Sequence, residues 1–298
     1  MKNRIYWRML CGTAIVCVLS TSAYYNSHIK ASHMYIYHEN ITVAVTDTPQ
    51  GGIAGVSMQK QKQKVLPEVY KALAVKSAQL LHEAVKTLTG VLDEGKIPYF
   101  MTFGTLLGSF RHHGRIPWDD DFDIAAKISD EPRIAELFLN VSDLSRSNRG
   151  VFWKIYPVAG AKIRGYPYKF PSVDIFWFKM DNATHLSLLR YPHTLFKVSD
   201  IFPTYRRPFN SLMLPAPCNT SLVLAKAIDN PSRCVSNYWN HMAEKYRPQS
   251  EILSVPCNQL HSLYPFVSRS SDNDDTVTES LVFNDTVLNR WTYKRLQC

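Results

Sequence analysis

The chain has 298 residues, of which 45% are hydrophobic and 12% aromatic, and this supplies a core for one large domain or two small ones. This composition excludes an intrinsically disordered protein. The net charge of +9 comes from Lys and Arg residues that are scattered and do not interleave with aromatic residues along one face, which argues against a nucleic-acid-binding protein. A basic surface equally suits anionic substrates such as nucleotide diphosphates.

The N-terminal segment carries a membrane-targeting pattern. An almost uncharged run from Met9 to Tyr25 follows the basic residues Lys2, Arg4 and Arg8. The pattern predicts a single membrane-spanning signal anchor with the N-terminus in the cytosol. A cleaved signal peptide is the alternative, because small residues from Ser20 to Ala23 offer a cleavage site. Both interpretations place the rest of the chain in the secretory lumen.

Glycosylation acceptors agree with a luminal chain. Asn-x-Ser/Thr triplets begin at Asn40, Asn140, Asn182, Asn219 and Asn284. A single triplet arises easily by chance, whereas five of them favour a glycoprotein.

The cysteines after the apolar run all lie late in the sequence. They are Cys218, Cys234, Cys257 and Cys298. Four luminal cysteines allow three pairings. We expect disulfides between Cys218 and Cys234 and between Cys257 and Cys298, with a structural zinc site as the alternative.

Three parts follow one another along the chain. Residues 1–25 are predicted to form a cytosolic tail and the anchor. Residues 26–64, rich in Ser, Thr and Gly and with a Gln-Lys repeat, predict a flexible luminal stem. Residues 65–298 are the luminal domain, with a core over 98–178.

The luminal domain has alternating helix and strand patterns. Apolar residues recur at helical spacing from Val69 to Leu88, and Gly95 and Pro98 end this long helix. Further helices are predicted at Gly104–His113, Glu131–Leu139, Ser221–Ile228 and Val235–Tyr246. Strands are predicted at Tyr99–Phe103, Phe122–Ala126, Val151–Tyr156, Ala161–Arg164 and Val173–Phe178, with the third and fourth paired. Ser268–Asp275 is predicted to be a solvated loop. The fold class is α/β (α+β mixed), a mixed sheet covered by helices.

The acidic run Asp-Asp-Asp-Phe-Asp ends at Asp123 and is the most informative stretch. In a strand, Asp121 and Asp123 project from the same face, where their carboxylates can hold one or two divalent ions. Like charges this close destabilise each other unless a cation separates them, which argues for a metal. The alternative is a solvated acidic turn, or ion pairs with Arg111 and Arg115.

Asp174 is a lone acid within the apolar strand Val173–Phe178 and needs a partner. If this strand lies beside the one that carries Asp121 and Asp123, three carboxylates converge in the arrangement that clamps metals for phosphoryl transfer. A buried ion pair with Lys162 or Arg164 is the alternative.

Gly104 and Thr105 lie at a strand-to-helix junction, where free backbone N–H groups suit a phosphate. The same glycine can serve the turn alone. Four basic residues follow the helix: Arg111, His112, His113 and Arg115. Each can neutralise phosphate charge, or act as an acid or base, or simply lie at the surface.

These motifs, in this order and spacing, resemble those of the LicD family, which includes fukutin and the fukutin-related protein. The matching segments are 104–109, 111–114, 116–124 and 173–176, and the resemblance is good over 98–178 and loose beyond it. The family is similar to the nucleotidyltransferase superfamily. The resemblance implies that Asp121, Asp123 and Asp174 are the catalytic and metal-ligating residues. Substrate-binding candidates are Gly104, Thr105, Arg111 and His113.

The resemblance also implies an activity. A phosphotransferase dependent on Mg²⁺ or Mn²⁺ would move a phospho-alcohol or phospho-sugar, such as ribitol phosphate or phosphocholine, from a CDP-type donor to a glycan or glycoprotein acceptor. Its expected location is the Golgi membrane, as a single-pass type II protein. The alternatives are an Asp-x-Asp glycosyltransferase that uses a UDP-sugar, and a non-catalytic glycan-binding or scaffold protein.

Overall fold

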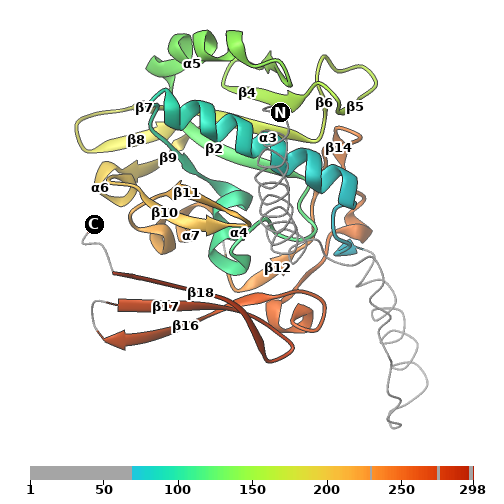
Figure 1. Cartoon of the computed structure of the whole chain (residues 1–298), viewed down its shortest axis with the longest axis vertical. Coiled ribbons are helices and arrows are strands. Elements are labelled where there is room, and N and C mark those ends of the chain that lie inside the picture. Colours follow the sequence, from blue (N-terminus) through green and yellow to red (C-terminus); the bar gives the residue numbers. More distant parts are fainter. Residues whose placement is uncertain (1–68, 229, 274–275, 295–297) are drawn as a thin grey trace, which may run out of the picture. The chain divides into compact units, whose positions relative to one another are not determined.

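The computed structural model describes residues 69–228, 230–273, 276–294 and 298 (Figure 1). The predicted anchor over 1–25 and stem over 26–64, together with Asn40, lie outside the described residues. None of the described helices combines the length and the apolar character that crossing a membrane requires.

The first helix of the described chain is α3 (Val75–Glu94). It buries Leu81, Val85, Leu88 and Leu92 along one stripe, as the helical spacing predicted. The helix begins later than expected, because the N–H of Leu73 donates to the carbonyl of Pro117 and ties this segment to a loop. α3 packs against the central strands, and Figure 1 shows it crossing the sheet.

A seven-stranded sheet forms the centre of the fold. Its main order is β1 (Tyr99–Met101), β2 (Asp121–Lys127), β7 (Ser172–Met180), β4 (Phe152–Pro157) and β3 (Leu144–Asn148), and β8 (His185–Leu188) and β9 (Tyr191–Lys197) continue from β7. β2 and β7 are parallel, whereas the other pairs are antiparallel. The predicted mixed sheet with helices is therefore confirmed. The helices α4 (Phe103–His112) and α5 (Glu131–Leu137) also lie where the sequence placed them.

The predicted pairing of Val151–Tyr156 with Ala161–Arg164 is wrong. β4 lies between β3 and β7, while β5 (Ala161–Lys162) pairs with β6 (Lys169–Phe170) in a separate hairpin. Burial explains the difference. β4 carries the fully buried Trp153 and Ile155 and takes a central position, whereas both residues of β5 are exposed.

Beyond the sheet the chain forms α6 (Val198–Ile201), the hairpin β10 (Tyr205–Phe209) and β11 (Leu212–Ala216), and α7 (Thr220–Ala227). The last of these is the predicted helix. Its N-terminus is capped by Asn219, whose side-chain oxygen accepts from the N–H of Leu222.

The predicted helix Val235–Tyr246 is absent, which corrects the sequence analysis. This segment takes part in three short strands, β12 (Arg233–Val235), β13 (Trp239–Asn240) and β14 (Lys245–Tyr246), and β12 pairs with β15 (Ser254–Pro256). Long-range contacts override the helical spacing here. β12 pairs with β15 and β13 pairs with β14, and these pairings replace the helical hydrogen bonds.

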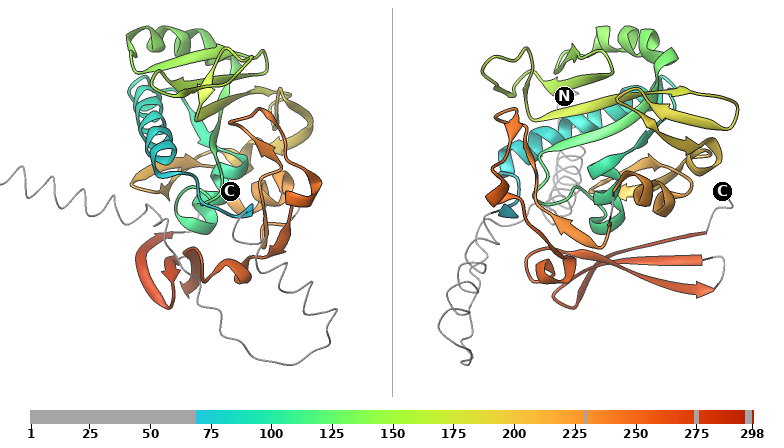
Figure 2. Two further views of the ribbon diagram at one scale, coloured as in Figure 1. Left: turned by 90° about the vertical axis from the view of Figure 1, so that its right-hand side faces the viewer. Right: turned by 180° about the vertical axis from the view of Figure 1, so that it is seen from behind.

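The predicted loop Ser268–Asp275 is also wrong over its described part. It belongs to β16 (Phe266–Asn273), which forms an antiparallel sheet with β17 (Thr276–Phe283) and β18 (Thr286–Lys294). The Ser, Asp and Asn residues of β16 predicted a loop, but β16 pairs with β17, whose inner face is buried through Val277, Glu279 and Leu281. Figures 1 and 2 both show this sheet on the side of α4 away from α3.

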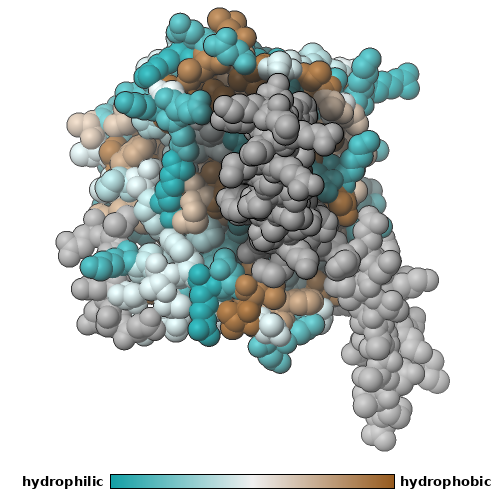
Figure 3. Space-filling view, viewed as in Figure 1, coloured by the Kyte–Doolittle hydropathy of each residue, from teal (hydrophilic) through white to brown (hydrophobic). Residues whose placement is uncertain are grey.

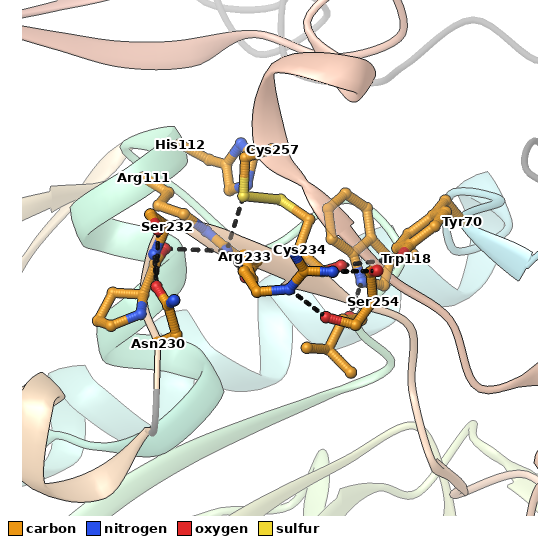
Figure 4. Close-up of a disulfide and its surroundings, with 12 residues drawn as sticks. Tyr70, Arg111, His112, Trp118, Asn230, Ser232, Arg233, Cys234, Ser254 and Cys257 are labelled. Carbon is orange, nitrogen blue, oxygen red and sulfur yellow. Dashed lines mark hydrogen bonds between the residues drawn. A yellow bond between two sulfur atoms is a disulfide. The ribbon is translucent and has the colours of Figure 1, made fainter.

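The disulfides differ from the expected pairs. Cys218 is bonded to Cys298, and Cys234 is bonded to Cys257. The antiparallel pairing of β12 with β15 sets Arg233 opposite Pro256, which brings Cys257 beside Cys234 (Figure 4). The two disulfides are therefore nested, with the two middle cysteines paired inside the outer pair, and all four thiols are used in disulfides instead of the alternative zinc site.

The described surface mixes hydrophilic and hydrophobic side chains. On the face drawn in Figure 3, hydrophilic residues surround smaller hydrophobic patches. Several of the most exposed large hydrophobic residues lie in the β13–β14 segment. They are Tyr238, Met242 and Tyr246, which are 60%, 56% and 71% exposed.

Candidate active site

Three predicted carboxylates meet on the central parallel strand pair. Asp123 of β2 lies opposite Asp174 of β7 in register, and Asp121 projects from the same face of β2 as Asp123. One carboxylate oxygen from each of the three lies within 4.8 Å of the others. Asp123 and Asp174 are buried, and the side chain of Asp121 is 12% exposed. The sequence-predicted convergence is present in the structure.

The turn before α4 supports this group of acids. The backbone N–H of Asp123 donates to Oγ1 of Thr105 (2.6 Å), so the helix start is tied to the strand. A Cβ on Gly104 would lie 2.6 Å from Oδ2 of Asp119, so only glycine lets that carboxylate approach the turn. Gly104 and Thr105 are thus both adjacent to the acids.

Lys154 is a site residue that the sequence analysis missed. It lies on β4 opposite Asp174, and its Nζ is 2.9 and 3.1 Å from the two carboxylate oxygens. The partner of Asp174 is therefore Lys154 and neither Lys162 nor Arg164, because β4 pairs with β7 and the β5–β6 hairpin does not. Burial opposes its charge, but Asp174 raises the pKa of Lys154 above the usual range. The sequence contains a pattern that indicates Lys154, because it is a lone charge in an otherwise apolar strand.

His241 is the second missed residue, and it comes from the C-terminal part of the chain. Its Nδ1 lies 2.7 Å from Oδ1 of Asp120 and its Nε2 lies 3.0 Å from Oδ2 of Asp121. Burial opposes protonation, but these two carboxylates raise the pKa of His241 well above its ordinary value. Asn237 donates to the carbonyl of Trp118 and holds the same segment in place. A histidine 121 residues away from Asp120 gives no sequence signal.

The site carries more negative than positive charge. Burial, together with Asp121 and Asp174, raises the pKa of Asp123 well above its ordinary value. Burial also raises the pKa of Asp119, and Asp121 and Asp120 add to this effect. The acidic cluster consists of Asp119, Asp120, Asp121, Asp123 and Asp174. Lys154 and His241 pair with only part of its charge.

A divalent cation fits the donor atoms of the acidic cluster. Asp121, Asp123 and Asp174 supply oxygen ligands, which Mg²⁺ prefers. Asp120, Asp121 and His241 form a second set with ligand atoms within 4.8 Å of one another, and its imidazole nitrogen suits Mn²⁺ better than Mg²⁺. A cation among these carboxylates would relieve the repulsion that raises the pKa of Asp123.

The other two substrate-binding candidates lie elsewhere. Arg111 is buried and donates to the carbonyl of Arg233 (3.0 Å), beside the disulfide of Cys257 (Figure 4). His113 is fully buried, with Nε2 2.8 Å from Oε2 of Glu279. The structure does not bring these two side chains into the acidic cluster.

Arg115 contacts the backbone of the loop before the acidic run. Its guanidinium donates to the backbone carbonyls of Ile116, Pro117 and Asp119. These contacts shape the loop that leads into the acidic run.

Aromatic rings border the acidic cluster. Burial raises the pKa of Tyr238, and Tyr191, Asp123 and Asp121 add to the effect, which places its hydroxyl near both acids. Tyr191 also packs edge-on against Phe103, with ring centroids 5.3 Å apart. The rings of Tyr191 and Tyr238 remain partly exposed and offer surface to a bound ligand.

Comparison with known proteins agrees with this geometry. The family model described as "LicD/FKTN/FKRP, nucleotidyltransferase domain" matches residues 96–219, which include all five acids of the cluster and Lys154. Residues 96–219 therefore form a domain of the LicD family. The LicD match ends before β12, so His241 lies outside the matched segment.

Curated relatives match only part of this chain. It is 29% identical over 147 residues to an uncharacterized protein of Rickettsia typhi, covering 49% of the chain and 44% of that protein. A second uncharacterized protein, from Rickettsia prowazekii, is 27% identical over 180 residues, or 59% of the chain and 60% of that protein. Ribitol 5-phosphate transferase FKRP of Homo sapiens is 31% identical over 74 residues, or 25% of the chain and 15% of that protein. The chain thus spans less than two thirds of each relative.

Proposed function

We propose that this LicD-domain protein is a metal-dependent phosphotransferase that moves a phospho-alcohol or phospho-sugar from a CDP-type donor to a glycan hydroxyl. The observation that carries the proposal is the convergence of Asp121, Asp123 and Asp174 on adjacent parallel strands beside the Gly104 turn. The LicD domain and the partial similarity to a ribitol 5-phosphate transferase support the reaction class.

Asp121, Asp123 and Asp174 would hold Mg²⁺ or Mn²⁺. When bound, the ion supplies charge neutralisation at the donor diphosphate and at the departing nucleotide. Lys154 fixes the orientation of Asp174 through two hydrogen bonds, and His241 fixes Asp121 through one. The acceptor oxygen forms the new bond to phosphorus, and the bond between phosphorus and CMP breaks.

The helix start gives the donor a place beside the acids. Backbone N–H groups in the first turn of α4 have no partner within the helix and can donate to a phosphate. Tyr191 and Tyr238 offer aromatic surface for the base or the acceptor. Arg111 and His113 have no part in this proposal, because their side chains are used elsewhere.

The proposed cellular setting is the Golgi lumen, with residues 65–298 as the catalytic domain behind a type II anchor. The charge pattern of the N-terminal sequence and five glycosylation acceptors support this setting. Two disulfides support it independently, because they persist in oxidising compartments.

Nucleotide release by the full chain tests the proposal. The protein is offered CDP-ribitol, CDP-choline and CDP-glycerol, then UDP- and GDP-sugars, with a glycan mixture and Mg²⁺ or Mn²⁺. We expect metal-dependent release of CMP, which Asp123→Asn removes. The control is Asp285→Asn, the same change at an exposed turn residue, and it should behave as wild type.

Two results would count against the proposal. Release of UDP or GDP would identify the alternative glycosyltransferase. Absence of both nucleotide release and metal-dependent nucleotide binding would favour the non-catalytic alternative.

A further inference from the structure

A cavity of about 580 Å³ lies between β10, the start of α7 and the three-stranded C-terminal sheet. Its walls include Phe110, Tyr205, Arg207, Asn219, Arg269 and Tyr293. The volume falls within the range of small-molecule sites. None of its lining residues belongs to the acidic cluster, so the proposed reaction does not use it.

Two aromatic residues of the cavity wall, Tyr205 and Tyr293, belong to a ring stack that also includes Trp291. Trp291 and Tyr293 of β18 stack with centroids 4.3 Å apart and an angle of 21° between the rings. Tyr205 of β10 lies 5.9 Å from Tyr293 at an angle of 30°. Tyr205 and Tyr293 line the cavity and are only partly buried, so their ring faces are available to a ligand. Such rings present an apolar face together with polar groups at the edge.

The inner end of the cavity is positively charged. Arg207 is fully buried, and its Nη2 donates to Oε2 of Glu279 (2.7 Å) while its Nη1 donates to the hydroxyl of Tyr205 (3.1 Å). Its Nε has no hydrogen-bond partner among the residues that the structure describes. Arg269 also pairs with Glu279, at 2.9 Å. Two guanidinium groups thus share one carboxylate, and none of the described residues that line the cavity is acidic.

The helix α4 separates the cavity from the acidic cluster. Thr105, near its start, binds the backbone of Asp123, whereas His113, just after its end, contacts Glu279. Thr105 and His113 are eight positions apart, so the two contacts are about 12 Å apart along the helix axis. A ligand in the cavity is therefore distinct from a nucleotide at the acids.

We propose that this cavity binds a sugar unit that carries a phosphate or a carboxylate. The C–H face of a sugar ring is apolar and packs against Tyr293 and Tyr205, while the ring hydroxyls meet the hydroxyl and amide groups of the wall. The anionic substituent meets the surplus guanidinium charge of Arg207 and Arg269. The choice of a sugar as the ligand rests on the proposed function, in which the acceptor is a glycan. The presence of the cavity and its positive charge do not depend on that proposal.

Mannose 6-phosphate is the probe, and its binding to the full chain is measured by saturation-transfer NMR in EDTA. Two variants alter the cavity. Tyr293→Ala removes an aromatic wall, and Ser271→Trp fills space beside Val277 while leaving the native ring stack intact. Thr292→Trp is the matched control, because Thr292 is exposed and points to the other face of β18 from Trp291 and Tyr293.

We expect the two cavity variants to weaken binding at least tenfold, while Thr292→Trp and Asp123→Asn bind as wild type does. Unmodified mannose should bind at least tenfold more weakly. The proposal fails if Asp123→Asn loses binding and Ser271→Trp keeps it, because the sugar then occupies the acidic cluster. Inorganic phosphate that binds as tightly as mannose 6-phosphate would also overturn it, as would no binding at all. CMP release is measured separately, so failure here leaves the proposed reaction untouched.

Discussion

The acidic cluster and the surroundings of Glu279 differ in how the charge of buried carboxylates is balanced. In the acidic cluster five carboxylates lie together, and Lys154 and His241 are the cations paired with them. Around Glu279 one carboxylate receives hydrogen bonds from His113, Arg207 and Arg269. The first group has a surplus of negative charge, and the second has a surplus of cationic partners.

The pKa shifts follow from this difference. Burial and neighbouring acids raise the pKa of Asp123. Burial opposes ionisation of Glu279, but His113, Arg207 and Arg269 lower its pKa to about 2. A fully paired carboxylate stabilises the contact between the C-terminal sheet and α4, whereas the surplus charge at Asp123 is a cost to folding that a bound metal can offset.

The largest expected effect is on turnover. Asp123→Asn keeps the shape of the side chain but removes one of the three converging charges. We expect CMP release to fall at least about 1,000-fold, the order of loss when a group that stabilises transition-state charge is removed. Thermal unfolding in EDTA should show no loss of stability, because repulsion is relieved. Unchanged turnover would refute the metal assignment.

Glu279→Gln should act on stability instead. It leaves Arg207 buried without a charged partner, so we expect a loss of about 3–5 kcal/mol in the free energy of unfolding. Urea unfolding measures this loss, and Glu83→Gln on an exposed carboxylate is the control. A change below about 1 kcal/mol would mean that the three donors do not stabilise the fold through Glu279.

The two regions should also respond to pH in opposite directions. The pKa of Glu279 is lowered from 4.5 to about 2, so its contribution is present above about pH 4.5 and is lost as the pH falls toward 2; the shift corresponds to about 3 kcal/mol. The pKa of Asp123 is raised, so in EDTA its cost appears as the pH rises through that pKa. Unfolding free energies between pH 3 and pH 8 test both signs.

Two variants show which residue causes the loss of stability at each end of the pH range. Glu279→Gln should flatten the loss at acidic pH, and Asp123→Asn should flatten the loss at rising pH. If each variant instead changes the limb assigned to the other, the electrostatic contrast between the two regions is wrong.

The smallest expected effect comes from His241, which orients Asp120 and Asp121. His241→Gln keeps a polar side chain but cannot bridge both acids as the imidazole does. We expect metal affinity or turnover to fall about 10- to 100-fold, as for other residues that orient metal ligands. The control is His261→Gln at an exposed position. A fall as large as that for Asp123→Asn would make His241 a ligand itself.

The sequence predicted the part of the site that local patterns encode. Alternation in β2 placed Asp121 and Asp123 on one face, and the isolated charge of Asp174 within an apolar strand indicated a buried partner. Lys154 shows the same pattern in its own strand, so it could have been predicted from the sequence as the partner of Asp174. The central strands and α3 followed from apolar spacing in the same way.

The parts that could not be predicted depend on contacts between distant segments. His241 reaches the acids from residues 235–246, which form short strands instead of the helix that their spacing favoured. Cys234 lies beside Cys257 because β12 pairs with β15. Arg111 and His113 contact Arg233 and Glu279, which are more than 100 residues away in the sequence. Sequence spacing carries no information on which distant segments meet.

Binding of Mn²⁺ to the full chain tests the central claim most directly. Free Mn²⁺ is followed by electron paramagnetic resonance as protein is added, for wild type, Asp123→Asn and the exposed control Asp285→Asn. The account predicts saturable binding to wild type and to Asp285→Asn and its loss in Asp123→Asn. Equal binding by all three proteins would contradict the assignment of the acidic cluster as the metal site.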